Sequence, residues 1–366
     1  MSINVIKIGG AVLKSKKGFE SMLDILNLHT QRPLLIVISA FSKATRDLER
    51  AARTAESGNE KEALKILDSI IKEHSEYAAG ILQDKITLES LNMLFDSSKQ
   101  RLYDFARGLT ITGELTPRTL DAMLSFGEFF ALHTVNHYLK EQGFEILCVD
   151  STSIIVSDDI YGNAKPLLKE TTKQVKEKLL PKIIDNTIVL TQGFVAKNRA
   201  GEVTTMGIES SNLTAVLYAE ILNAETITFW TDVPGIRSAD PKIVKNTLAI
   251  QHLSYSDAYT AASNGLKLIY PQMLEYVASK KIQLCYKSAF QPKSDETWIM
   301  TNSSQSKVPI VISLEGLFLS EIQLSSSEDR NDWIAFADKL SKDSNDVILL
   351  SSSANSLRLV FRQGSI

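Results

Sequence analysis

Short apolar, β-branched runs alternate with longer stretches of helical periodicity along most of this chain of 366 residues, and this alternation constrains the fold more than any other feature. Continuous apolar strands separated by helices favour a mostly parallel sheet that helices cover on both faces. We therefore expect an α/β protein with a three-layer α-β-α sandwich. The expected strands are Asn4–Ile8, Leu34–Ser39, Glu145–Asp150, Thr187–Gly193, Thr226–Thr231 and Gln283–Tyr286.

Two segments depart from plain alternation. Residues 44–130 are almost entirely helical in pattern and predict a helical insertion after the second strand. Residues 193–207 predict a hairpin whose turn is Asn198–Gly201. The expected helices are Arg46–Ser57, Lys61–Ile81, Leu88–Arg107, Thr119–Lys140 and Asn212–Leu222, the last with Ser210 or Ser211 as its N-cap.

A domain boundary is expected in the polar run Thr301–Lys307, which divides the chain into residues 1–302 and 303–366. Beyond it, Val308–Ser327 predicts a strand, Arg330–Lys342 an amphipathic helix and Asp346–Arg362 a pair of strands. The second part is thus a small α+β unit of β-α-β-β order, too short to hold a large core of its own.

Composition excludes several classes of protein. The net charge of −3 gives no basic excess for nucleic acid or an anionic membrane, and no apolar run reaches bilayer-spanning length. We expect a soluble, cytoplasmic protein. Cys148 and Cys285 lie inside apolar runs and are expected to be buried thiols, while His133 and His137 lack a third ligand nearby in sequence, so no metal site is predicted.

Two of the expected strands end in residues suited to bind phosphate. Lys7 is followed by Gly9 and Gly10, whose amides can approach a phosphate closely while the lysine supplies positive charge. A tight turn with a solvated lysine explains the same residues equally well, and no P-loop pattern is present. Ser39 ends the second strand and Thr45 follows it, which leaves room for a ligand at the strand ends.

Later segments add further candidates. Glu128, within a long helical pattern, is suited to bind an ammonium group, although surface glutamates are commoner. Ser211 lies at a helix start, where an anion site and an ordinary N-cap use the same residues. The remaining candidates for a nucleotide are Thr231, Asp232, Lys242 and Lys267, which an ordinary loop also accommodates.

The order of these segments resembles the aspartokinases of the amino acid kinase family. Lys7–Gly10 is similar to the family's opening Lys-Phe-Gly-Gly, and Ser125–Glu128 to its Ser-His-Gly-Glu. The longest similar stretch runs from Leu190 to Val244 and includes Trp230–Gly235 (Trp-Thr-Asp-Val-Pro-Gly). The resemblance covers residues 3 to 300 and implies the amino acid kinase fold.

The resemblance also implies an activity, the ATP-dependent phosphorylation of L-aspartate to 4-aspartyl phosphate with Mg²⁺, by a homodimer. Lys7 would stabilise the transferred phosphoryl group, and Glu128, with Thr45 and Ser211, would hold the amino acid. ATP would lie against Gly9, Gly10, Ser39, Thr231, Asp232, Lys242 and Lys267. Residues 303–366 resemble one incomplete ACT module.

This sequence departs from the family pattern in one central loop. The family's Arg-Gly-Gly-Ser-Asp is here Ile208–Asn212, so an arginine that grips a substrate carboxylate and an aspartate that organises the site are replaced. Ala11 and Val12 also replace a Thr-Ser pair. Three alternatives stay open: an aspartate kinase, a kinase of the same fold with another carboxylate substrate, and a binding or regulatory protein. Lys43, Arg46 and Arg118 are candidates to replace the arginine.

Overall fold

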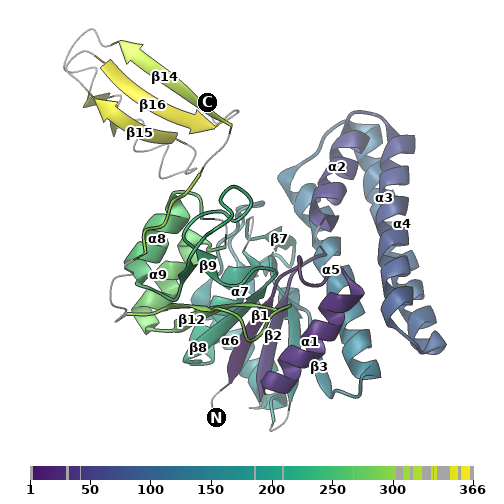
Figure 1. The fold of residues 1–366 in the computed structure, drawn as a ribbon. Helices are drawn as coiled ribbons and strands as arrows, with labels where there is room; N and C mark the ends of the chain where they lie inside the picture. The colour runs from purple at the N-terminus through teal and green to yellow at the C-terminus, as the bar shows by residue number, and fades with distance from the viewer. Residues whose placement is uncertain are drawn as a thin grey trace.

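The computed structural model describes residues 3–29, 33–41, 43–184, 187–207, 210–266, 268–301, 308–313, 316–323, 331–332, 334–335, 347–352 and 356–362. Within them, an eight-stranded sheet forms the centre of the main body (Figure 1). From one edge to the other, the strands are β11 (His252–Leu253), β13 (Thr297–Ile299), β12 (Gln283–Ser288), β8 (Thr226–Thr231), β1 (Asn4–Ile8), β2 (Leu34–Ile38), β5 (Ile188–Gln192) and β3 (Ile146–Val149).

The sheet is mostly parallel, as the apolar runs predict. Neighbouring strands from β12 to β3 all pair in parallel, and β13 is antiparallel to β12. All six predicted strands are present, with ends that differ by up to two residues. The edge strand β11 and its neighbour β13 were not predicted, because two or three residues carry too little periodicity to distinguish a strand from a loop.

Alternate side chains of each central strand pack into two separate hydrophobic cores. In β2, Leu34, Ile36 and Ile38 belong to one core and Leu35 and Val37 to the other. Helices α1 (Lys16–Leu28) and α5 (Pro117–Glu141) cover the first core, whereas α7 (Ser211–Ile221), α8 (Tyr255–Ser263) and α9 (Pro271–Lys280) cover the second. Since side chains of a strand alternate between faces, this arrangement is the predicted three-layer sandwich.

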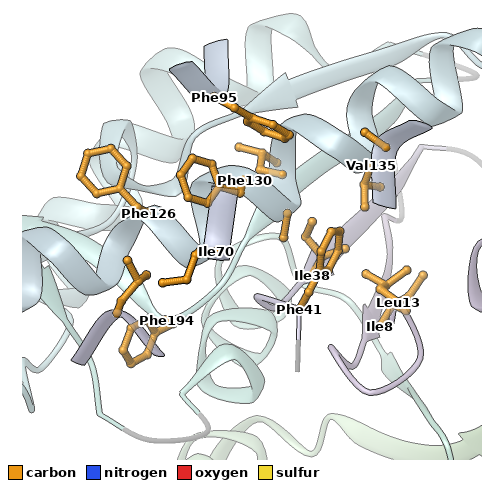
Figure 2. Packing of buried hydrophobic residues seen from close by; sticks show 14 of the residues in the cluster. Ile8, Leu13, Ile38, Phe41, Ile70, Phe95, Phe126, Phe130, Val135 and Phe194 are labelled. Carbon is orange, nitrogen blue, oxygen red and sulfur yellow. The ribbon is translucent and has the colours of Figure 1, made fainter. Parts of the chain in front are cut away.

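The predicted helical insertion is present and extends the first core (Figures 1 and 2). Asn59 and Asp84 cap two of its helices by accepting hydrogen bonds from backbone amides, and Gly113 ends the longest helix in a left-handed conformation. Phe95 and Phe130 pack edge to face, with ring centroids 5.2 Å apart. The inserted helices are α2 (Ala44–Glu56), α3 (Glu60–Ile81) and α4 (Lys85–Thr112).

The predicted hairpin consists of β6 (Val195–Asn198) and β7 (Val203–Thr205), which pair in antiparallel fashion. Its turn is closed by Gly201, whose amide donates to the carbonyl of Asn198 at 3.0 Å. Further elements of the main body are β4 (Val156–Ser157), α6 (Leu168–Gln174), β9 (Ile236–Arg237) and β10 (Ala249–Ile250).

The C-terminal part contains a separate antiparallel sheet in the order β14 (Leu317–Gln323), β16 (Ser356–Arg362), β15 (Val347–Ser352). The predicted pair of strands is confirmed, but the strand expected from Val308 begins only at Leu317. Residues 308–313 instead follow the main body, where Val308 and Ile310 pack on the second core. Most of the expected helix 330–342, and the expected boundary at residues 302 and 303, lie outside the described residues.

Cys285 is buried in β12, Cys148 is half-buried in β3, and both thiols are free. No helix in the described part of the chain is both long enough and apolar enough to cross a bilayer.

Candidate active site

Four neighbouring strands end side by side at the carboxyl edge of the sheet. β8, β1, β2 and β5 are adjacent and parallel, and they bring Thr231, Gly9, Ser39 and Gly193 to the same edge. Gly9 donates its amide to the carbonyl of Trp230 at 3.0 Å, and Gly193 donates to that of Ile38 at 2.9 Å. Ligands of open α/β sheets bind outside this edge, so the fold itself places the predicted residues where a ligand would lie.

Lys7 lies against the glycine turn that follows its own strand. Its Nζ atom is 3.7 Å from the position that a β-carbon on Gly9 would take, so the ammonium group reaches the end of β1. Gly9 and Gly10 are each partly exposed, and a side chain at Gly9 would stand between the lysine and the carbonyl of Trp230. The turn thus combines a positive charge with accessible backbone, as the sequence predicts.

Beside these strand ends lies a cavity of about 370 Å³, here called the Glu128 cavity. Ser39, Thr45, Glu128 and Ser211, which the sequence predicts as site residues, all line it. They come from the end of β2, the first turn of α2, the middle of α5 and the start of α7. The other described residues of the lining are Ala40, Glu49, Leu120, Asp121, Leu124, Gly162, Phe194, Thr205 and Gly207.

Ser211 is held in the wall of this cavity by two close contacts. Ser39 donates its hydroxyl hydrogen to Ser211 Oγ at 2.7 Å. A β-carbon on Gly193 would lie 2.4 Å from the β-carbon of Ser211, so only glycine fits between β5 and α7. Ser210 occupies the N-cap position, but its side chain makes no capping bond, and its buried Oγ has no partner. The expectation of a side-chain cap is therefore wrong, because Ser210 adopts a helical backbone conformation and its hydroxyl faces the interior.

Glu128 is a buried carboxylate with one unsatisfied oxygen. Gly127 allows α5 to approach the segment after β2 closely, since a β-carbon there would be 3.3 Å from that of Ala40. The amide of Ala40 consequently donates to Glu128 Oε1 at 3.3 Å, while Oε2 has no partner among the described residues. With the side chain only 4% exposed, burial raises the pKa of Glu128 to about 8 against the opposing effect of that hydrogen bond. The second oxygen is suited to accept from a cationic ligand.

Asp121 is a second buried carboxylate of the lining, and the sequence argument missed it. It accepts hydrogen bonds from the amide and hydroxyl of Thr205, at 2.8 and 2.7 Å, and from the amide of Gly162 at 2.9 Å. Burial raises its pKa, and these bonds act in the opposite direction. Its position seven residues before Glu128, two turns earlier on the same helical face, is the signal that points to it.

The Glu128 cavity has an acidic lining. Glu49, Asp121 and Glu128 contribute carboxylates, and no lysine or arginine occurs among its described lining residues. Arg118, a candidate to replace the missing arginine, forms an ion pair with Glu202 at 2.8 Å. Asn212 is buried at the start of α7, and Ile208 lies outside the described residues.

The predicted nucleotide residues follow β8 at increasing distances along the chain: Thr231 ends the strand, Asp232 comes next, and Lys242 lies beyond β9. Thr231 adjoins the Gly9 turn, but its hydroxyl donates to the carbonyl of Val233 at 2.8 Å and so shapes its own turn. Asp232 and Lys242 are exposed and do not line the Glu128 cavity. Lys267 lies outside the described residues. Among the residues searched, no group of three or more His, Cys, Asp or Glu side chains is arranged to hold a metal ion.

Known proteins with sequences similar to this chain are named aspartokinases. Aspartokinase 1, chloroplastic, of Arabidopsis thaliana is 28% identical over 310 residues, which are 83% of this chain and 53% of that protein. Lysine-sensitive aspartokinase 3 of Escherichia coli K12 is 28% identical over 302 residues, which are 81% of this chain and 64% of that protein. The chain therefore spans between half and two thirds of the length of these two relatives.

Solved structures agree on the fold. Escherichia coli aspartokinase III, in complex with aspartate and ADP, superposes with a TM-score of 0.79 at 22% identity and covers all of this chain and 79% of that one. The aspartate kinase of Clostridium acetobutylicum superposes with a TM-score of 0.70 at 20% identity, over all of this chain and 79% of that one. The model of the amino acid kinase family matches residues 2–285, and the chain belongs to that family.

Proposed function

We propose that this chain transfers the γ-phosphoryl group of ATP to the side-chain carboxylate of L-aspartate and so forms 4-aspartyl phosphate. Its relatives in Arabidopsis thaliana and Escherichia coli are named aspartokinases. The observation that carries the proposal is the position of the Glu128 cavity, which opens beside the strand ends that hold Lys7 and Gly9.

The acceptor would bind in the Glu128 cavity. Its ammonium group would donate to Glu128 Oε2, which has no partner in the described chain and would gain one in the complex. The hydroxyl groups of Thr45 and Ser211 would donate to its carboxylates, taking over part of the role that an arginine has in the family pattern, while Ser39 keeps its hydrogen bond to Ser211. This arrangement would turn the acceptor carboxylate toward the end of β1.

The phosphoryl donor would bind along the glycine turn. The ammonium of Lys7 and the backbone of Gly9 and Gly10 would face the β- and γ-phosphates, where negative charge develops during transfer. The nucleotide would extend toward the loop after β8, to Thr231, Asp232, Lys242 and Lys267. Mg²⁺ would arrive with the nucleotide, held by phosphate oxygens and the exposed carboxylate of Asp232, and would neutralise phosphate charge.

Trapping the product tests the proposal directly. Purified chain is incubated with Mg-ATP, hydroxylamine and single amino acids, and the hydroxamate formed from an acyl phosphate is measured by its coloured ferric complex. We expect hydroxamate with L-aspartate and none with L-asparagine, which lacks the acceptor carboxylate. Lys7→Ala should reduce the signal to background. Nucleotide binding without hydroxamate from L-aspartate would contradict the assignment.

The acidic lining favours one alternative within the same fold, a kinase that acts on a different carboxylate. Aspartate brings two negative carboxylates to a cavity whose described lining holds Glu49 and Asp121 in addition to Glu128 and no lysine or arginine. An acceptor with an ammonium group and a single carboxylate meets less repulsion there. Hydroxamate formed from 4-aminobutyrate or β-alanine, and not from L-aspartate, would establish this alternative.

We also propose that the chain forms a homodimer and that residues 303–366 form a partial ACT-like domain. The antiparallel sheet of β14, β16 and β15 supports the second proposal, because it contains three strands, the number that the sequence predicts for this part of the chain. Light scattering coupled to size-exclusion chromatography measures the mass of the assembly, and twice the chain mass of 40.6 kDa is expected.

A further inference from the structure

A second cavity lies where the helical insertion meets the loops after β1 and β2. It has a volume of about 210 Å³ and is here called the His74 cavity. Lys14, Phe41 and Lys43 line it from the two loops, and α2 and α3 supply the rest. It shares none of its described lining residues with the Glu128 cavity.

His74 presents an unsatisfied hydrogen-bond acceptor in this cavity. Its side chain lines the cavity and is 4% exposed. Its Nδ1 lies 2.7 Å from the carbonyl oxygen of Ile70, and because a carbonyl only accepts, Nδ1 carries the proton. Burial lowers the pKa of His74, which keeps the ring neutral and leaves Nε2 with a free lone pair. Within the described part of the chain, no group bonds to Nε2.

Tyr77, one turn further along α3, presents an unsatisfied donor. Its hydroxyl oxygen is buried and has no partner among the residues that the structure describes, and the side chain lines the same cavity. Burial, with the charge of Glu73 as a smaller cause, raises the pKa of Tyr77 to about 12, so the hydroxyl keeps its proton. Buried polar groups are normally hydrogen-bonded. A ligand that offers both an acceptor for the Tyr77 hydroxyl and a donor for His74 Nε2 would satisfy both groups.

Side chains of both charge signs surround His74 and Tyr77. Lys14 and Lys43 are exposed at the cavity, and Asp47 and Glu73 face it from α2 and α3. Asp47 also pairs with Arg50 on its own helix at 3.1 Å. A simple anion would meet the two carboxylates, and a simple cation would meet the two lysines. A molecule with both charges satisfies both sets of side chains.

We propose that the His74 cavity binds a free α-amino acid with a short side chain. The ammonium group would donate to His74 Nε2 and lie near Asp47 and Glu73. The carboxylate would accept from the hydroxyl of Tyr77 and lie near Lys14 and Lys43. The short side chain would pack on Phe41 and Ile70, two residues of the first hydrophobic core (Figure 2).

Isothermal titration calorimetry of the full chain tests the proposal without any assay of turnover. L-Alanine, L-serine and glycine are the probes, and acetate and ethylamine carry the two charges singly. We expect at least one amino acid to bind, and acetate and ethylamine to bind at least about tenfold more weakly. No heat with any amino acid, or acetate binding as tightly as L-alanine, would overturn the proposal.

Variants locate the site. Tyr77→Phe removes only the open hydroxyl and should weaken amino acid binding about tenfold, and His74→Phe should do the same where it folds. Tyr103→Phe is the matched control, because Tyr103 bonds to Asp68 outside the cavity, and it should leave binding unchanged. Binding that survives Tyr77→Phe and is lost in Glu128→Gln would place the ligand in the Glu128 cavity and refute the inference.

Discussion

Glu128→Gln removes a buried carboxyl group whose ionised form is unfavourable in the folded protein. Burial raises the pKa of Glu128 from 4.5 to about 8, so the folded chain binds a proton between these values that the unfolded chain has released. The stabilisation that comes with this proton is complete below pH 4.5 and is lost as the pH rises toward 8. Each pH unit in this window is worth ~1.36 kcal/mol, and from pH 5 to pH 8 the loss is about 3 to 4 kcal/mol.

Glutamine keeps the shape of the side chain and has no proton to lose. The stability of Glu128→Gln relative to the natural chain should therefore increase by about 3 to 4 kcal/mol between pH 5 and pH 8. Equilibrium unfolding in urea measures this difference, with the fluorescence of the buried Trp230 as the signal. Glu114→Gln, at an exposed position before α5, is the control and should show a constant difference.

Two results would refute the reasoning. A stability difference between Glu128→Gln and the natural chain that stays constant from pH 5 to pH 8 would mean that the carboxyl group is solvated in the folded protein. A difference that decreases with pH would mean that Glu128 is stabilised as a carboxylate, by a cation that the described contacts do not include.

Three further substitutions test the site. Lys7→Ala should lower hydroxamate formation at least ~100-fold while the far-ultraviolet circular dichroism stays the same, and retained turnover would remove Lys7 from the phosphoryl site. Asp121→Ala leaves the amides of Thr205 and Gly162 without their acceptor and should cost about 1–3 kcal/mol in urea unfolding, and an unchanged midpoint would contradict this bonding. Gly193→Ala drives a methyl group into Ser211 and should cost about 1–3 kcal/mol, measured in the same way, whereas a neutral effect would mean that β5 and α7 separate easily.

Local patterns predicted the framework of the site because strand ends are local features. Lys7 and Gly9 follow one apolar run and Ser39 follows another, and the parallel order of the sheet then brings them to one edge. Glu128 needed the family resemblance, since nothing in a helical pattern distinguishes a buried glutamate from an exposed one. Its burial depends on how closely α5 approaches Ala40.

Other features depend on contacts between distant segments and could not be read from the sequence. Asp121 bonds to Thr205, 84 positions later, and a lone aspartate on a helix carries no sign of such a partner. Ser210 occupies the N-cap position, but its backbone is helical and its buried side chain makes no capping bond. Three-dimensional packing overrides local preference at both positions.

The two cavities share the short segment that joins β2 to α2. Ala40 donates its amide to Glu128, whereas the ring of Phe41 stacks on His74 with centroids 5.5 Å apart. Successive residues of one segment thus form walls of different cavities, and a ligand that fixes one wall constrains the other. Because coupling between two binding sites is reciprocal, an amino acid that binds beside His74 and changes the affinity of the Glu128 cavity must have its own affinity changed by the same factor. Calorimetric titration of each ligand at increasing concentrations of the other measures this factor from both directions, and an affinity that keeps falling without levelling off would mean that the two ligands compete for one cavity.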